Sequence, residues 1–234
     1  VVYFIKPKPL IMPKTEDYLA LEGAIDQAFQ ASLTPQEAFR LLESGNIRFL
    51  NHLTNRRSRG NLLEDASTGQ YPYAAVLGCI DSRVPVEEVF DAAFGDMFVA
   101  RVAGNIVNAD ILGSLEYACK YAGAKVILVL GHTKCGAVQG AWSKLNDGNI
   151  TGLLERITPA VEETQATHGT EATDSNLMAC VVANINNTIQ EIRNGSAILA
   201  SMEAANELAL VGGIYNVSTG HVTFVNQPDW APIA

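Results

Sequence analysis

The sequence predicts an α/β fold with a mainly parallel central sheet, one antiparallel edge strand, flanking helices and an N-terminal helical arm. Three short apolar runs alternate with helical patterns, which is typical of strands covered on both faces in a parallel sheet. Two further strand-like runs near the C-terminus are separated only by Ser218-Thr219-Gly220, a turn sequence that indicates a hairpin. Strands and helices that alternate in this way are typical of the α/β class.

The composition fits one globular domain. The chain has 234 residues, of which 48% are hydrophobic, enough for a sizeable core. Its formal net charge of −9 argues against nucleic acid or an anionic membrane as partners. No apolar run approaches the roughly 20 residues that span a bilayer. A cytoplasmic location is favoured, and a periplasmic or organellar one would require that an N-terminal signal has been removed.

The spacing of apolar residues predicts each element in turn. Strand runs are short and continuously apolar, whereas helices repeat apolar residues every three to four positions. In chain order, we expect helices over 17–31 and 35–51, a loop over 52–72, strands over 74–79 and 97–102, a helix over 109–122, a strand over 125–131, a helix after Cys135, helices over 152–165 and 174–193, and strands over 210–217 and 221–225.

The helix over 35–51 has the clearest start. Thr34 can cap it, Pro35 suits the first helical position, and Glu37 completes a capping box. The basic segment over 55–60 that follows this helix is interpreted as solvated surface, with a role between subunits as the alternative.

The four cysteines are too few for a disulfide scaffold in a chain of this length, and they include no Cys-x-x-Cys pair. Cys119 lies in a helical pattern and Cys180 in an apolar run, so both are interpreted as buried small hydrophobes. A disulfide between these two residues is the alternative. The other two cysteines, Cys79 and Cys135, lie in polar clusters.

Each polar cluster follows the end of a predicted strand. The first is Cys79-Ile80-Asp81-Ser82-Arg83, and the second is His132-Thr133-Lys134-Cys135. Because sites in open α/β sheets collect at the carboxyl ends of the strands, the two clusters can converge. Two thiolates and one imidazole are typical of a zinc site that leaves one position open for water. The sequence therefore predicts an open zinc site.

The charge of this ligand set gives Asp81 and Arg83 a function. Zinc with two thiolates is formally neutral, so it should acidify water less than zinc held by three imidazoles. Such a site gains from an acceptor that orients the bound water, and Asp81 is placed for this. Arg83 can hold Asp81 ionised through a charge-assisted hydrogen bond. The alternatives are a structural zinc site that Asp81 closes as the fourth ligand, and two buried cysteines that are unrelated to each other.

These clusters and their flanks resemble the β-class carbonic anhydrases. The other matching segments are Gly69-Gln70, Arg83-Val84-Pro85, Arg101-Val102-Ala103-Gly104-Asn105, Gly113-Ser114-Leu115-Glu116-Tyr117-Ala118, Gly131-His132 and Cys135-Gly136. The resemblance covers roughly residues 35–225. It implies the reversible hydration of carbon dioxide to bicarbonate and a proton by a zinc-dependent lyase with one zinc ion per subunit.

The resemblance also implies roles for individual residues. The zinc ligands would be Cys79, His132 and Cys135, and the catalytic dyad Asp81 with Arg83. The matched substrate-pocket residues are Gln70, Phe98, Tyr117 and Gly136. Without the resemblance, the two aromatic residues of this set would be interpreted as core.

The resemblance further implies a homodimer or a dimer-based higher oligomer. In the family, several pocket residues come from the neighbouring subunit, so the site lies at the dimer interface. Residues 1–60 are then expected to form a helical arm and loop that embrace the partner, as part of one domain. Residues 61–234 are expected to form the zinc-binding catalytic part.

The sequence departs from some family members at position 76. Those members carry a Trp three residues before the first cysteine, in an inhibitory bicarbonate pocket, and Val76 stands here. Arg101 and Tyr215 match other parts of that pocket. The missing Trp favours the open form, in which Asp81 is paired with Arg83.

Two other functions would use the same residues. A hydrolase of CS₂ or COS would act on a different linear substrate, and a non-catalytic protein would keep zinc for structure alone. Access to the pocket would separate the two substrates, and the position of Asp81 would separate an open site from a closed one. His52, His168 and His221 lie in polar surroundings and are expected at the surface, with no assigned part in proton transfer.

Overall fold

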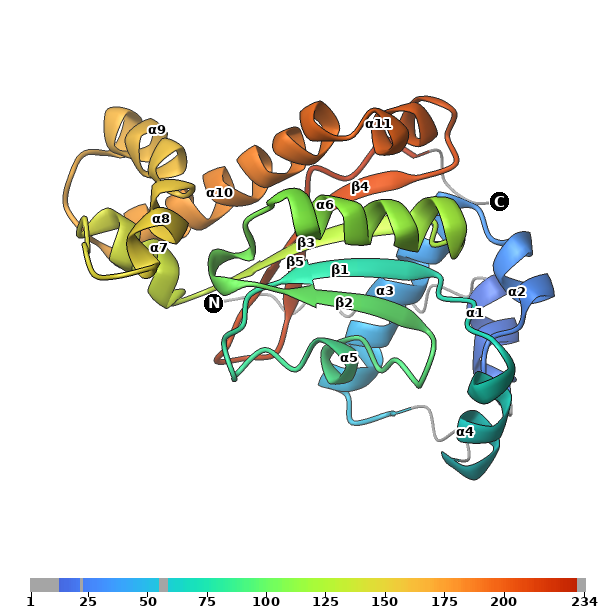
Figure 1. The fold of residues 1–234 in the computed structure, drawn as a ribbon. Coiled ribbons are helices and arrows are strands. Elements are labelled where there is room, and N and C mark those ends of the chain that lie inside the picture. The colour runs from blue at the N-terminus through green and yellow to red at the C-terminus, as the bar shows by residue number, and fades with distance from the viewer. Residues whose placement is uncertain (1–12, 22, 55–58, 231–234) are drawn as a thin grey trace.

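A five-stranded sheet lies at the centre of the computed structural model, which describes residues 13–21, 23–54 and 59–230 (Figure 1). The strands are β1 (Ala74–Gly78), β2 (Met97–Arg101), β3 (Val126–His132), β4 (Ala209–Tyr215) and β5 (Val222–Val225). Their order in the sheet is β2-β1-β3-β4-β5, in which the first four strands are parallel and β5 is antiparallel to β4. This confirms the predicted mainly parallel sheet with one antiparallel edge strand.

Helices cover both faces of the sheet, with α6, α10 and α11 over one face and α3 and α5 over the other (Figure 1). The helices of the described residues are α1 (Pro13–Leu19), α2 (Gln27–Ser32), α3 (Pro35–Leu50), α4 (Arg59–Thr68), α5 (Val86–Val89), α6 (Ala109–Glu116), α7 (Gly136–Trp142), α8 (Ile150–Glu155), α9 (Thr158–His168), α10 (Asp174–Gly195) and α11 (Ala197–Ala204), with a 3-10 turn η1 (Ala103–Asn105) and a π-helical turn η2 (Tyr117–Tyr121). None of these helices combines the length and apolar character needed to cross a bilayer.

Alternate residues of the central strands face two hydrophobic clusters. Leu77 and Ile127 pack toward α6, α10 and α11, whereas Val76 and Leu128 pack toward α3 and α5. Every residue of β1 and β3 is buried, as the continuous apolar runs predict. The edge strand β2 is only partly buried. The sheet therefore buries β1 and β3 and leaves its β2 edge partly accessible.

The helix predicted over residues 17–31 is wrong, because the segment contains two short helices. α1 ends at Leu19, and α2 begins at Gln27. The Asp26 carboxylate accepts a hydrogen bond from the Phe29 main-chain N–H at 2.7 Å and so caps α2. The spacing of apolar residues continues across this cap. A prediction from that spacing therefore treats the two helices as one.

α3 confirms its predicted capping box. The Thr34 hydroxyl accepts from the Glu37 main-chain N–H at 3.2 Å, and the Glu37 carboxylate accepts from the Thr34 main-chain N–H at 2.8 Å. The helix packs against the sheet through fully buried residues such as Phe39 and Leu42.

Other predicted boundaries need correction. α4 lies in the segment predicted as a loop, and α11 was not predicted, although the Ser196 hydroxyl caps it by accepting from the Leu199 N–H at 3.2 Å. The segment over 152–165 contains parts of α8 and α9, because Pro159 suits a new helix start rather than a helix interior. Of the basic segment predicted over 55–60, residues 55–58 lie outside the described residues.

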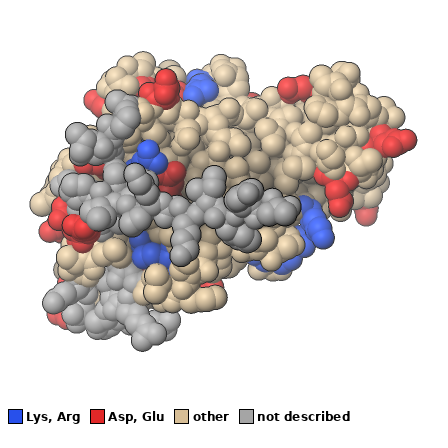
Figure 2. All heavy atoms as spheres, turned by 180° about the vertical axis from the view of Figure 1, so that it is seen from behind, with Lys and Arg blue, Asp and Glu red and all other residues tan. Residues whose placement is uncertain are grey.

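Charged side chains are scattered over the face seen from behind (Figure 2). Asp and Glu lie at both ends of this face, and the Lys and Arg visible there occur in small groups. On the visible, described part of this face, the net negative charge of the chain is therefore spread out rather than gathered in one patch.

Candidate metal centre

Three potential metal ligands converge at the carboxyl ends of β1 and β3. Cys79 directly follows β1, His132 is the last residue of β3, and Cys135 is the N-cap residue of α7. Because β1 and β3 are parallel neighbours, paired up to Gly78 and Leu130, both strand ends lie at one edge of the sheet. The three donor atoms lie within 4.8 Å of one another, and the three side chains are buried. The predicted convergence of the two clusters is confirmed.

His132 keeps one ring nitrogen available for a metal ion. Its Nδ1 lies 2.9 Å from the Thr133 carbonyl oxygen, which can only accept, so Nδ1 carries the proton in this contact. Its Nε2 is buried and makes no hydrogen bond within the described residues. A buried nitrogen without a partner is costly, and a metal ion would supply that partner.

Hydrogen bonding between the two ligand thiols favours ionisation of one of them. The hydrogen bond with Cys135 lowers the pKa of Cys79, whereas the Cys79 sulfur and burial raise the pKa of Cys135. The Gly104 main-chain N–H also donates to Cys79 Sγ at 3.3 Å. A divalent cation would displace the remaining proton and stabilise both thiolates. Two thiolates and one imidazole fit zinc with one position free for water.

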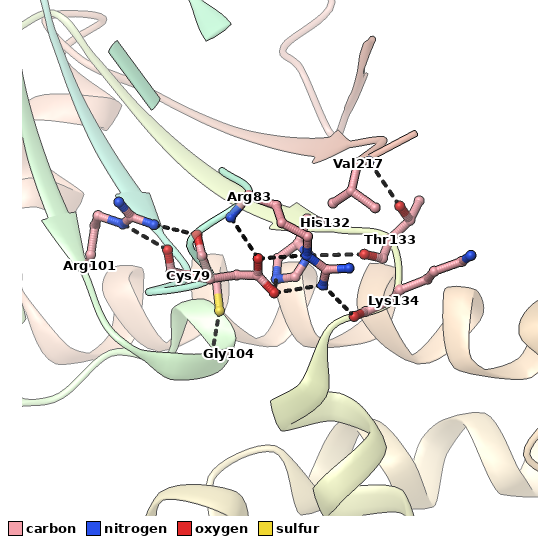
Figure 3. Close-up of polar contacts among 9 residues, drawn as sticks. Cys79, Arg83, Arg101, Gly104, His132, Thr133, Lys134 and Val217 are labelled. Carbon is pink, nitrogen blue, oxygen red and sulfur yellow. Dashed lines mark hydrogen bonds and ion pairs between the residues drawn. The ribbon is translucent and has the colours of Figure 1, made fainter. Parts of the chain in front are cut away.

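Asp81 and Arg83 form a bidentate ion pair, and the Arg83 guanidinium lies beside Lys134 (Figure 3). Arg83 donates from Nε to Oδ1 at 2.9 Å and from Nη2 to Oδ2 at 2.7 Å, and its main-chain N–H donates to Oδ1 at 2.9 Å. These hydrogen bonds hold the pKa of Asp81 well below its usual range. Oδ2 lies 3.9 Å from His132 Nε2. Arg83 Nη2 also donates to the Lys134 carbonyl oxygen at 3.2 Å, which ties the two clusters together.

Of the four matched pocket residues, only Gly136 lies at this end of the chain's own sheet, as the first residue of α7. Gln70 precedes β1, whereas Cys79 follows the far end of that strand. Phe98 pairs with Ala75 in the sheet, and Ala75 lies about 13 Å of extended chain before Cys79. One chain therefore does not bring Gln70 and Phe98 to its own ligands.

Tyr117 lies with Phe98 and Tyr121 in a cluster that we call the aromatic face. Tyr117 packs edge-on against Phe98, with ring centroids 6.1 Å apart, and stacks on Tyr121 at 6.2 Å. Tyr117 is 53% exposed and Tyr121 is 76% exposed. Phe98 and Tyr117 also line a groove of about 820 Å³ between β2 and α6. The prediction that Tyr117 would be core in the absence of the resemblance is wrong.

Of the three positions compared with the inhibitory bicarbonate pocket, only Val76 departs from the family residue, whereas Arg101 and Tyr215 match it. Val76 is fully buried, and Tyr215 is a buried residue at the end of β4. Arg101 donates from Nε to the Cys79 carbonyl oxygen at 2.9 Å and from Nη2 to the Asp81 carbonyl oxygen at 2.6 Å. These contacts were not predicted from the sequence. No sequence pattern signals them, because they depend on the register in which β1 pairs with β2.

The remaining cysteines and histidines lie outside the metal centre. Cys119 and Cys180 are buried free thiols, which confirms them as small hydrophobes and excludes a disulfide between them. Burial raises the pKa of Cys119 to about 12 and that of Cys180 to about 11, so both stay protonated near neutral pH. The three other histidines are exposed, as expected: His52, His168 and His221.

Comparisons with known proteins point to one family. A family model described as carbonic anhydrase matches residues 74–222. The chain is 35% identical to a carbonic anhydrase of Mycolicibacterium smegmatis over 194 residues, which cover 80% of this chain and 92% of that protein. The solved β-carbonic anhydrase CcaA has a TM-score of 0.67 at 24% identity, covering 80% of this chain and 94% of that one. One of two tetrameric β-carbonic anhydrases from Sordaria macrospora has a TM-score of 0.63 at 22% identity, covering 80% and 96%.

Proposed function

The chain belongs to the carbonic anhydrase family and has the fold of the β class, and we propose that Cys79, His132 and Cys135 hold its zinc ion, one per subunit. As a carbonic anhydrase it catalyses the reversible hydration of carbon dioxide to bicarbonate and a proton. The observation that carries the zinc proposal is the set of three buried donors within 4.8 Å, which includes a His132 nitrogen without a hydrogen bond in the described residues.

The residues beside the ligands orient the reacting groups. Zinc, when bound, lowers the pKa of a coordinated water so that this water can act as a nucleophile near neutral pH. We propose that Asp81 accepts a hydrogen bond from the attacking water. This hydrogen bond directs a lone pair of the water oxygen at carbon dioxide. Arg83 keeps Asp81 ionised and fixed in direction. The Gly136 main-chain N–H is the proposed donor to a substrate oxygen.

The position of Asp81 supports an open site rather than a closed structural one. Asp81 accepts three hydrogen bonds from Arg83, and it would have to lose some of them to become a metal ligand. Three protein donors leave the fourth position for water, as in catalytic zinc sites.

The functional unit that we propose is a homodimer or a dimer-based higher oligomer, in which the aromatic face of one subunit completes the pocket of the other. Three observations support it: Gln70, Phe98 and Tyr117 lie away from the ligands of their own chain, β2 is an edge strand, and one structural neighbour is described as tetrameric. Residues 1–60 are the proposed arm that contacts the partner.

Metal removal tests the zinc proposal. Treatment of the purified protein with a strong chelator should abolish carbon dioxide hydration in a stopped-flow assay, and one equivalent of zinc per subunit should restore it. Full activity in protein shown to be metal-free by elemental analysis would contradict the proposal.

A further inference from the structure

Arg101 is the last residue of β2, and its side chain reaches the loop that carries the first ligand (Figure 3). Nε donates to the Cys79 carbonyl oxygen at 2.9 Å, and Nη2 donates to the Asp81 carbonyl oxygen at 2.6 Å. β1 and β2 are paired in register up to Gly78 and Arg101. Arg101 therefore lies beside the point where the chain leaves the sheet and turns into the metal centre.

The residues after Arg101 hold the same loop. The Val102 main-chain N–H donates to the Gly78 carbonyl oxygen at 3.1 Å, and the Gly104 main-chain N–H donates to Cys79 Sγ at 3.3 Å. Segment 101–104 thus makes four hydrogen bonds to residues 78–81, two of them from one guanidinium. The sheet ladder continues through these contacts into the metal centre.

Two arginines hold Asp81 at different groups. Arg83 binds its carboxylate, and Arg101 binds its main-chain carbonyl. When both ends of a residue are fixed, its side chain cannot turn without breaking a charge-assisted hydrogen bond. A guanidinium can donate to two acceptors at a fixed separation, whereas an ammonium is a compact charge that lacks this planar fork.

We propose that Arg101 is a positioning residue that acts through the main chain of Cys79 and Asp81, and thereby sets the direction of one zinc ligand and of the acidic group beside it. The proposal rests on the proposed zinc site. It differs from a role for Arg101 in binding bicarbonate, because two of its donors are directed at main-chain carbonyl oxygens of its own subunit.

The test compares Arg101→Gln with Arg193→Gln in the full chain. Arg193 pairs with Glu203 between α10 and α11, so its loss is the matched control for removal of one paired guanidinium. Residues that orient metal ligands typically change metal affinity or activity by about 10- to 100-fold when they are replaced. We expect Arg101→Gln to weaken zinc binding by at least about tenfold in a chelator competition, and to lower kcat much more than it changes KM.

The control should match wild type in both measurements, and wild-type zinc affinity and kcat in folded Arg101→Gln would overturn the proposal. The two claims can fail separately. A wild-type protein without carbon dioxide hydration would contradict the proposed function. Zinc affinity needs no turnover, so the comparison of zinc affinities would still decide the role of Arg101. If Arg101→Gln does not fold, Arg101→Lys decides in the same assays. It should give a smaller loss of the same kind, and wild-type values would overturn the proposal.

A double substitution asks whether Arg101 acts through Asp81. If it does, the loss of kcat in Arg101→Gln/Asp81→Asn should be smaller than the product of the two single losses. Losses that multiply in full would overturn this route of action.

Discussion

The metal end of the molecule, which we define as residues 79–83 and 132–136, is held together by contacts within one chain, whereas the aromatic face stays partly exposed in that chain. At the metal end, Arg83 binds Asp81, and Thr133 accepts from His132. At the aromatic face, Tyr117 remains half exposed beside an edge strand. Exposed aromatic side chains next to an accessible strand are typical of an interface. We infer that one subunit builds the metal site and that a second subunit completes the substrate pocket.

Loss of a ligand at the metal end should have the largest effect. His132→Ala removes the imidazole and leaves two thiolates, so we expect carbon dioxide hydration to fall to the uncatalysed background and bound zinc to fall well below one per subunit. Stopped-flow kinetics and elemental analysis measure these two quantities. Cys119→Ala is the matched control from the core and should keep both. A His132→Ala protein with wild-type zinc content and activity would break the assignment of the metal end.

Loss of the acidic group should have the next largest effect. Asp81→Asn keeps the shape of the side chain but removes the charge that Arg83 binds, so we expect kcat to fall by about 10- to 100-fold while zinc stays bound. Steady-state rates measured across pH together with zinc content test this. Rates equal to wild type at every pH would remove Asp81 from the mechanism.

Mixed dimers would sharpen the contrast between the two regions. Cys79→Ser removes a ligand, and Tyr117→Ala removes a pocket residue. We expect Tyr117→Ala to lower kcat less than the loss of a ligand or of Asp81 does. In a dimer of one Cys79→Ser subunit and one Tyr117→Ala subunit, one site would carry both defects and the other site neither. We therefore expect activity to rise above the sum of the two separate proteins when they are dissociated and reassembled together. No gain in dimers that are shown to be mixed would place Tyr117 outside the partner's site.

The smallest expected effect concerns the glycine that supports the first ligand. Gly104 has φ 70°, and a Cβ there would lie 2.5 Å from Ile157 Cδ1. Gly104→Ala should therefore lower the free energy of unfolding by about 1–3 kcal/mol in urea denaturation while it keeps the N–H that donates to Cys79. Gly148→Ala is the control, because Gly148 also has positive φ but has nothing within 4 Å of the added Cβ. Equal losses in both variants would show that the crowding at Gly104 has no cost.

The sequence predicts the metal end better than the rest of the molecule, for a physical reason. Cys79 and His132 lie at the ends of continuous apolar runs, and parallel strands bring such ends together. The break between α1 and α2 depends on the local cap at Asp26, which apolar spacing does not register. The Arg101 contacts arise from strand pairing, so they become visible only when the register of β1 and β2 is known.

The sequence identifies the residues of the aromatic face, but their spacing does not predict that these side chains are exposed. The sequence pattern around Phe98 and Tyr117 fits a buried strand and a buried helix as well as it fits exposed ones. The edge position of β2 is what leaves these two side chains accessible. We propose that a second subunit covers them, and the pattern of apolar residues in one sequence carries no direct information on such a contact.

A zinc-bound crystal structure near neutral pH, with the metal located by anomalous scattering, tests the central claim most directly. We predict zinc at about 2.3 Å from Cys79 and Cys135 Sγ and about 2.0–2.1 Å from His132 Nε2. Water should be the fourth ligand, and Asp81 should remain paired with Arg83. Zinc bound to other residues, or an Asp81 carboxylate oxygen as the fourth ligand, would contradict the account.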